Sequence, residues 1–129
     1  MKLKHMKLKL MFLMTVLLLA TAPMVSAAET AVADIATIVM HLNHYPSTAE
    51  KASLAKIIAN SQSSAGEKAL AGALMHMQHQ VGGADAEKLR GLAADNKAPQ
   101  GERTLATILL GIAHHPSSSD MQRLKVLAR

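Results

Sequence analysis

Apolar residues recur at helical spacing in a segment that begins near residue 35. Ile35, Ile38, Val39 and Leu42 lie at positions i, i+3, i+4 and i+7, which is the period of one face of an α-helix. A shorter apolar stripe follows after a turn at Pro46. Because Val and Ile keep this spacing and do not alternate with polar residues, we expect no strand. The pattern predicts two helices joined by a turn, a helical hairpin.

The same pattern returns twice at a shift of 35 residues, without a gap. Residues 70–96 and 105–129 both align with residues 35–61. One hairpin of this size cannot bury its apolar face, whereas three packed in series can. The sequence therefore predicts an all-α fold of three tandem 35-residue hairpins with six helices, arranged as a short α-solenoid or a compact bundle. The units span about residues 29–61, 64–96 and 99–129.

Serine and acidic residues mark the expected helix starts. Ser47 with Glu50, and Ser117 with Asp120, have the spacing of a capping box before the second helix of a unit. Unit two has Gly82 and Asp85 at these places, a weaker cap. Ser64 with Glu67, and Pro99 with Glu102, open the first helices of units two and three. We expect these acidic side chains to face the positive helix ends or solvent.

The first 27 residues are typical of a secretory signal peptide. A lysine-rich start precedes an apolar run over residues 10–20 and a stretch of small residues. Cleavage is expected after Ala27. The run is too short to span a bilayer comfortably, although an uncleaved anchor is the alternative. Without cysteine a lipoprotein anchor is excluded. We therefore expect a periplasmic or secreted protein with no stable membrane anchor after cleavage.

The charge of the remaining residues, 28–129, is nearly balanced. Four of the 14 Lys and Arg residues lie in the signal segment, which leaves ten basic against nine acidic residues and a net charge of +1. Tyr45 is the one aromatic residue after the signal segment. A nucleic-acid-binding protein would need a basic surface with aromatic platforms, so nucleic acid is not an expected partner. About 100 residues suffice for a single small domain.

Histidines gather at one place in every unit, the end of the first helix. At 100° per residue they point away from the apolar stripe, so packing the units would bring them to a shared face. Histidines three apart on a helix could offer two nitrogens to one ion, and imidazole suits Zn, Cu and Ni. Unit three departs from this pattern, because Gly111 replaces the first histidine and the pair becomes adjacent. The candidate metal ligands are His41, His44, His76, His79, His114 and His115.

Three other interpretations of the histidines need no metal. Histidine near a helix C-terminus interacts favourably with the helix dipole and can bond the last carbonyls. Duplication of one ancestral hairpin would copy its histidines without a functional reason. The histidines could also form a strip that binds a partner. Met40 and Met77 lie in apolar columns of the repeat, so we expect them to pack in the core and not to bind metal.

No pattern in the sequence indicates an enzyme. The serine clusters lie in turns, no G-x-S-x-G motif accompanies them, and the carboxylates fall at helix starts or on polar faces. We expect no catalytic or cofactor-binding residue. The first functional hypothesis is an exported interaction module that binds an unknown protein or peptide, and the alternative is a metal-binding or metal-buffering protein. An apolar flank on the last helix also suggests a homodimer through the C-terminal hairpin: Met121, Leu124, Val126 and Leu127.

Overall fold

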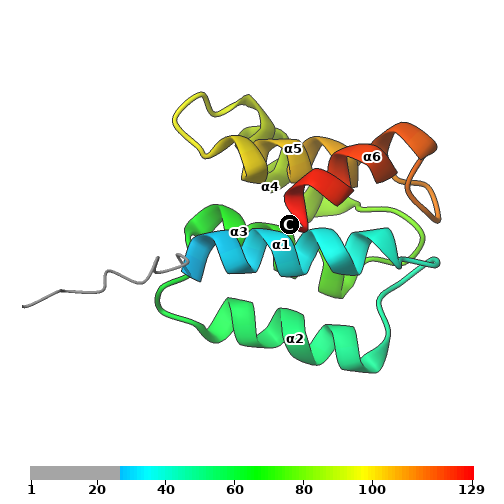
Figure 1. Cartoon of the computed structure of the whole chain (residues 1–129), viewed down its shortest axis with the longest axis horizontal. Helices are drawn as coiled ribbons and strands as arrows, with labels where there is room; N and C mark the ends of the chain where they lie inside the picture. Colours follow the sequence, from blue (N-terminus) through cyan, green and yellow to red (C-terminus); the bar gives the residue numbers. More distant parts are fainter. Residues whose placement is uncertain (1–26) are drawn as a thin grey trace, which may run out of the picture.

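The computed structural model describes residues 27–129 of the chain. The expected signal peptide, residues 1–27, lies outside this part except for Ala27. The described residues form six α-helices and no strand, so the all-α prediction is confirmed (Figure 1). No helix among them is long and apolar enough to cross a membrane. The helices are α1 (Ala27–Met40), α2 (Thr48–Ala59), α3 (Ala65–His76), α4 (Gly83–Ala94), α5 (Gln100–Gly111) and α6 (Ser118–Leu127).

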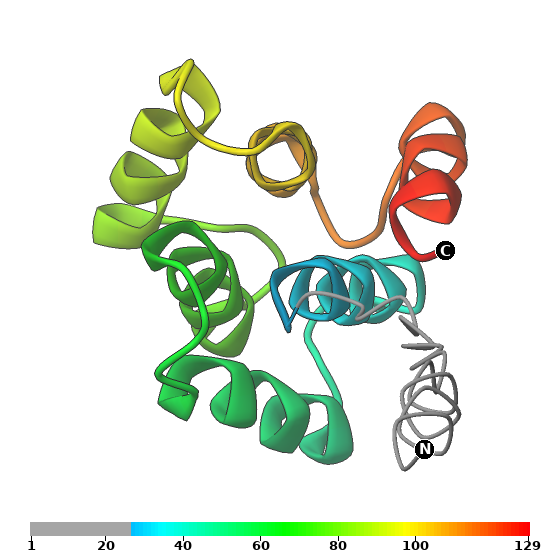
Figure 2. The same ribbon diagram turned by 60° about the vertical axis from the view of Figure 1, so that its left-hand side comes forward.

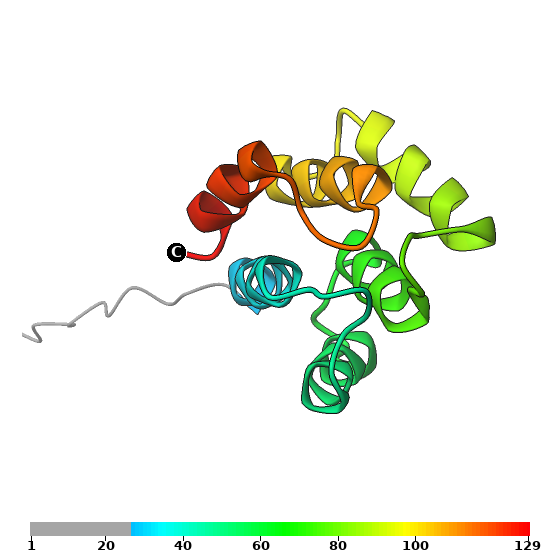
Figure 3. The same cartoon turned by 90° about the vertical axis from the view of Figure 1, so that its right-hand side faces the viewer.

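The first helices of the three units form the centre of the molecule. Helices α1, α3 and α5 all contact one another, and α2, α4 and α6 lie around them (Figure 2). Each outer helix packs mainly against the first helix of the following unit: α2 against α3, and α4 against α5. Helix α6 closes the arrangement by packing against α1 (Figure 3). Of the two predicted arrangements, the structure is the compact bundle, with the three units related by an approximate threefold axis.

The core consists of the columns that the repeat predicts. Each inner helix contributes four aligned positions to it, the loop after each inner helix contributes one more, and each outer helix contributes one leucine that is fully buried. Burial of these apolar side chains supplies most of the stability, since the chain has no disulfide. The buried columns are Ile35, Leu70 and Leu105; Ala36, Ala71 and Ala106; Ile38, Ala73 and Ile108; Val39, Leu74 and Leu109; Leu42, Met77 and Ile112; and Leu54, Leu89 and Leu124.

Three of the predicted helix starts have a side-chain cap. Ser47 and Glu50 form a complete capping box, as do Ser64 and Glu67. The Ser117 hydroxyl accepts a hydrogen bond from the Asp120 N–H at the start of α6. Helices α4 and α5 begin without a side-chain cap. The turns after the inner helices therefore start the outer helices at fixed residues, which fixes the length of the loops that hold the histidines.

The apolar flank expected on the last helix is largely covered. Leu124 is fully buried, and Met121 and Leu127 pack against the core, because α6 lies on α1. Val126 alone of the four is exposed. The expectation of an open apolar flank was wrong, and the reason is the closure of the ring of units. A homodimer through this hairpin stays a prediction without that support.

Candidate metal centre

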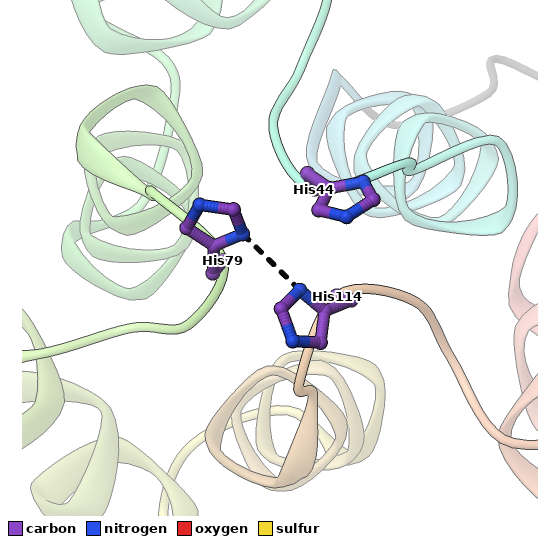
Figure 4. Close-up of side chains that lie close together, drawn as sticks. All are labelled: His44, His79 and His114. Atoms are coloured by element: carbon purple, nitrogen blue, oxygen red, sulfur yellow. Dashed lines mark hydrogen bonds between the residues drawn. The ribbon is translucent and has the colours of Figure 1, made fainter.

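Three histidines, one from each unit, meet at the C-terminal end of the inner helices. His44, His79 and His114 lie in the loops that follow α1, α3 and α5 (Figure 4). Their ring centroids are 4.9–5.2 Å apart, and the rings meet edge to face. One ring nitrogen from each lies within 4.8 Å of the others. We call this group the histidine triad.

The backbone of the same three residues forms a closed ring of hydrogen bonds. The His44 N–H donates to the His114 carbonyl at 2.9 Å, His79 donates to His44 at 3.0 Å, and His114 donates to His79 at 2.8 Å. Every unit therefore donates one bond and accepts one. This ring fixes the three Cα positions around the approximate threefold axis, so the triad is held by the backbone before any side chain takes part.

Each triad histidine has a left-handed backbone conformation. The φ angles are 72° for His44, 74° for His79 and 77° for His114. No other residue except glycine has a positive φ in the described part of the chain. Residues with a side chain adopt this conformation at some cost, although histidine tolerates it better than most. The conformation turns the chain sharply after the helix and aims the three peptide groups at one another.

The side chains of the triad are open to solvent and partly ordered by hydrogen bonds. His79 and His114 are exposed and His44 is partly exposed. The Nδ1 atoms of His79 and His114 are 3.1 Å apart, so one of them donates a proton and the other accepts it. The Nδ1–H of His44 donates to the Asn43 side-chain oxygen at 2.7 Å. This bond leaves the lone pair of neutral His44 on Nε2, where a metal could bind it.

The spacing of the triad is close to what a tetrahedral ion requires. Zinc bound to imidazole nitrogens at 2.0–2.1 Å holds them about 3.4 Å apart. The pair of Nδ1 atoms at 3.1 Å already has nearly this separation. The longest separation within the triad, 4.8 Å at most, would need a further approach of about 1.4 Å, which rotation of exposed imidazoles can supply.

The other three candidate histidines lie outside the triad. His41 is exposed just after the end of α1. His76 is exposed and lies 2.9 Å from the Asp85 carboxylate. His115 Nδ1 lies 3.2 Å from the Pro116 carbonyl. The inner helices end at Met40, His76 and Gly111, so the expectation that each H-x-x-H pair occupies neighbouring positions on one helix was wrong. The structure brings together the same position of three units and not the two members of a pair.

The ends of the inner helices also bear on the interpretation that the histidines bond the last carbonyls of their helices. The triad residues lie three or four positions beyond the last helical residue, and their backbone groups bond to one another. They therefore do not cap the last carbonyls of their own helices. Met77 is buried in the same column as Leu42 and Ile112, which places its thioether in the core.

Comparison with protein-family models, with curated proteins and with solved structures finds no match to this chain.

Proposed function

We propose that this chain is a metal-binding protein in which the histidine triad holds one transition-metal ion. The observation that carries the proposal is the convergence of three imidazoles, one from each repeat unit, on a position fixed by a ring of backbone hydrogen bonds. Three neutral imidazoles suit Zn, Cu and Ni. With three protein ligands on an exposed face, the fourth position stays open to water or another ligand.

Combined with the expected export signal, this geometry supports metal binding or buffering outside the cytoplasm. We propose binding and not catalysis, because no pattern in the sequence indicates an enzyme. Binding of a protein or peptide partner is the other function that the sequence suggests. No contact in the described residues favours a particular partner, and this function stays a prediction.

Calorimetric titration with Zn²⁺, Cu²⁺ and Ni²⁺ at neutral pH tests the proposal. We expect one ion per chain and a stabilisation of about 2.7 kcal/mol when free metal is a hundredfold above the dissociation constant. His79→Asn and His114→Asn should abolish both signals. Asparagine is the suitable replacement, because it tolerates the left-handed backbone at these positions.

His41→Asn is the matched control, since His41 is an exposed histidine of the same repeat that lies outside the triad. It should bind metal like the wild type. Metal binding that survives His79→Asn, or that is lost in His41→Asn, would show that the triad is not the site. Circular dichroism of the metal-free variants verifies that each remains helical.

A further inference from the structure

Two buried glutamates lie at the opposite end of the inner helices from the histidine triad. Glu67 and Glu102 occupy the same position in units two and three, in the first turn of α3 and α5. Their side chains are 0% and 3% exposed. Unit one has Val32 at this position. The repeat therefore brings two carboxylates, and one apolar side chain, to the approximate threefold axis.

Ser64 connects the two carboxylates. Its N–H donates to Oε2 of Glu67 at 2.9 Å, and its hydroxyl donates to Oε1 of Glu102 at 2.6 Å. Gly66 leaves room for this arrangement, because a Cβ at that position would collide with the Glu102 carboxyl. The other oxygen of Glu67, Oε1, is buried and has no hydrogen-bond partner. The pair is thus only partly satisfied by the protein.

The pair also has no countercharge. The ion pairs among the described residues join His76 to Asp85, Arg90 to Glu87 and Arg123 to Asp120, so none involves Glu67 or Glu102. Buried charges in proteins are ordinarily paired, because an unpaired charge loses its hydration without compensation. Burial raises the pKa of Glu67, and the nearby charge of Glu102 raises it further. Since no described side chain forms an ion pair with Glu67 or Glu102, a proton or a bound cation would have to neutralise the pair.

A cavity adjoins the two carboxylates. Its volume is about 650 Å³, and it is lined by Glu67 and Glu102 together with apolar side chains that include Val32 and Leu127. Val126, also in the lining, is 64% exposed and lies at the opening. A cavity of this volume is in the range that binds small organic ligands. Arg129 lines the same cavity without forming an ion pair with either glutamate.

We propose that this cavity binds a small organic cation, a primary ammonium group on a short apolar chain. The ammonium group would supply a countercharge beside the two carboxylates, and the apolar chain would pack against Val32 and Leu127. A bare Mg²⁺ or Ca²⁺ fits less well, because such ions need six or more oxygen ligands, whereas the walls of the cavity are largely apolar. The proposal is independent of the metal site.

Calorimetry and thermal melting with n-butylammonium test the proposal, at mildly alkaline pH, constant ionic strength and with EDTA present to keep the triad free of metal. We expect saturable binding of one n-butylammonium per chain and a melting temperature that rises with its concentration. n-Butanol, which has the same apolar chain without the charge, should leave the melting temperature unchanged.

Two variants of different kinds locate the site. Glu102→Gln removes the charge and Val126→Trp narrows the opening, and either should abolish n-butylammonium binding. The matched control is Glu87→Gln on the exposed face of α4, which should bind like the wild type. Absence of saturable binding to the wild type in the millimolar range would overturn the proposal, because the pair would then be neutralised by a proton. Undiminished binding to Glu102→Gln and Val126→Trp would overturn it as well.

Discussion

Replacing Glu67 by Gln should stabilise the protein at neutral and alkaline pH. The Glu67 side chain is fully buried, one of its oxygens has no partner, and the Glu102 carboxylate adds repulsion. Leaving a buried acceptor unsatisfied costs about 1–3 kcal/mol, and more when it is charged. Glutamine keeps an oxygen for the Ser64 N–H and leaves a neutral amide N–H₂ group, in place of a charged oxygen, without a partner. We therefore expect Glu67→Gln to raise the free energy of unfolding by about 1–3 kcal/mol near pH 8.

The pH dependence of this gain follows from the direction of the pKa shift. Burial and then Glu102 raise the pKa of Glu67 above its ordinary value of 4.5. Between the unfolded and the folded pKa, the folded state holds more protons, so the wild type loses stability as pH rises. The penalty is absent below about pH 4.5 and complete above the raised pKa. The difference between Glu67→Gln and the wild type should therefore vanish in acid and reach its full size at alkaline pH.

Urea denaturation of both proteins across this pH range measures the difference directly. Groups far from Glu67 contribute alike to both proteins and cancel in the comparison. Glu87→Gln, on an exposed carboxylate, supplies the baseline and should show no such trend. A Glu67→Gln protein that is less stable than the wild type near pH 8, or a difference that does not change with pH, would refute the account of Glu67 as a buried and uncompensated charge.

Two further predictions concern the packing of the bundle. Gly66→Ala should destabilise by about 1–3 kcal/mol, because the new Cβ would collide with the Glu102 carboxyl. A Cβ added at Gly72, in the same helix, would meet nothing within 4 Å, so Gly72→Ala should stabilise the protein by about 0.5–1 kcal/mol. Urea midpoints that shift in the same direction in both variants would contradict this. Leu124→Ala should cost about 2–5 kcal/mol, as much as Leu89→Ala, because both leucines are fully buried in a closed ring. A cost for Leu124→Ala well below that for Leu89→Ala would indicate that α6 does not close the ring in solution.

Most of the fold could be predicted from apolar spacing and the 35-residue repeat. The columns of Ile35, Val39 and Leu54 and their copies are buried as expected, because a helical period and a core face follow from the same residues. Closure of the ring could not be predicted in this way. Whether α6 packs on α1 or points into solvent depends on the rotation between successive units, and a small difference in that angle leaves the apolar pattern unchanged.

The candidate site was predicted only in part, for the same reason. The sequence predicts the histidines on a shared face. It also predicts that the first helix of unit one continues to His44, whereas that helix ends at Met40 and His44 has a left-handed backbone. One signal was present in the sequence. The repeat position of His44 has histidine in all three units, whereas the repeat position of His41 has glycine, Gly111, in the third unit. Glu67 and Glu102 were expected to face the positive helix ends or solvent. Their alignment with Val32, three residues before Ile35 on the apolar stripe, was the sign of burial.

The approximate threefold axis explains why both candidate sites exist. In an open stack, corresponding side chains lie one helix spacing apart, about 8–10 Å. Around a closed axis they converge, and the triad centroids lie about 5 Å apart. Aligned residues then become clusters, three histidines at one end of the inner helices and two carboxylates, from α3 and α5, at the other. Clusters of this kind are lost together when the ring opens, so Leu124→Ala should weaken metal and n-butylammonium binding alike, whereas His79→Asn should affect metal alone.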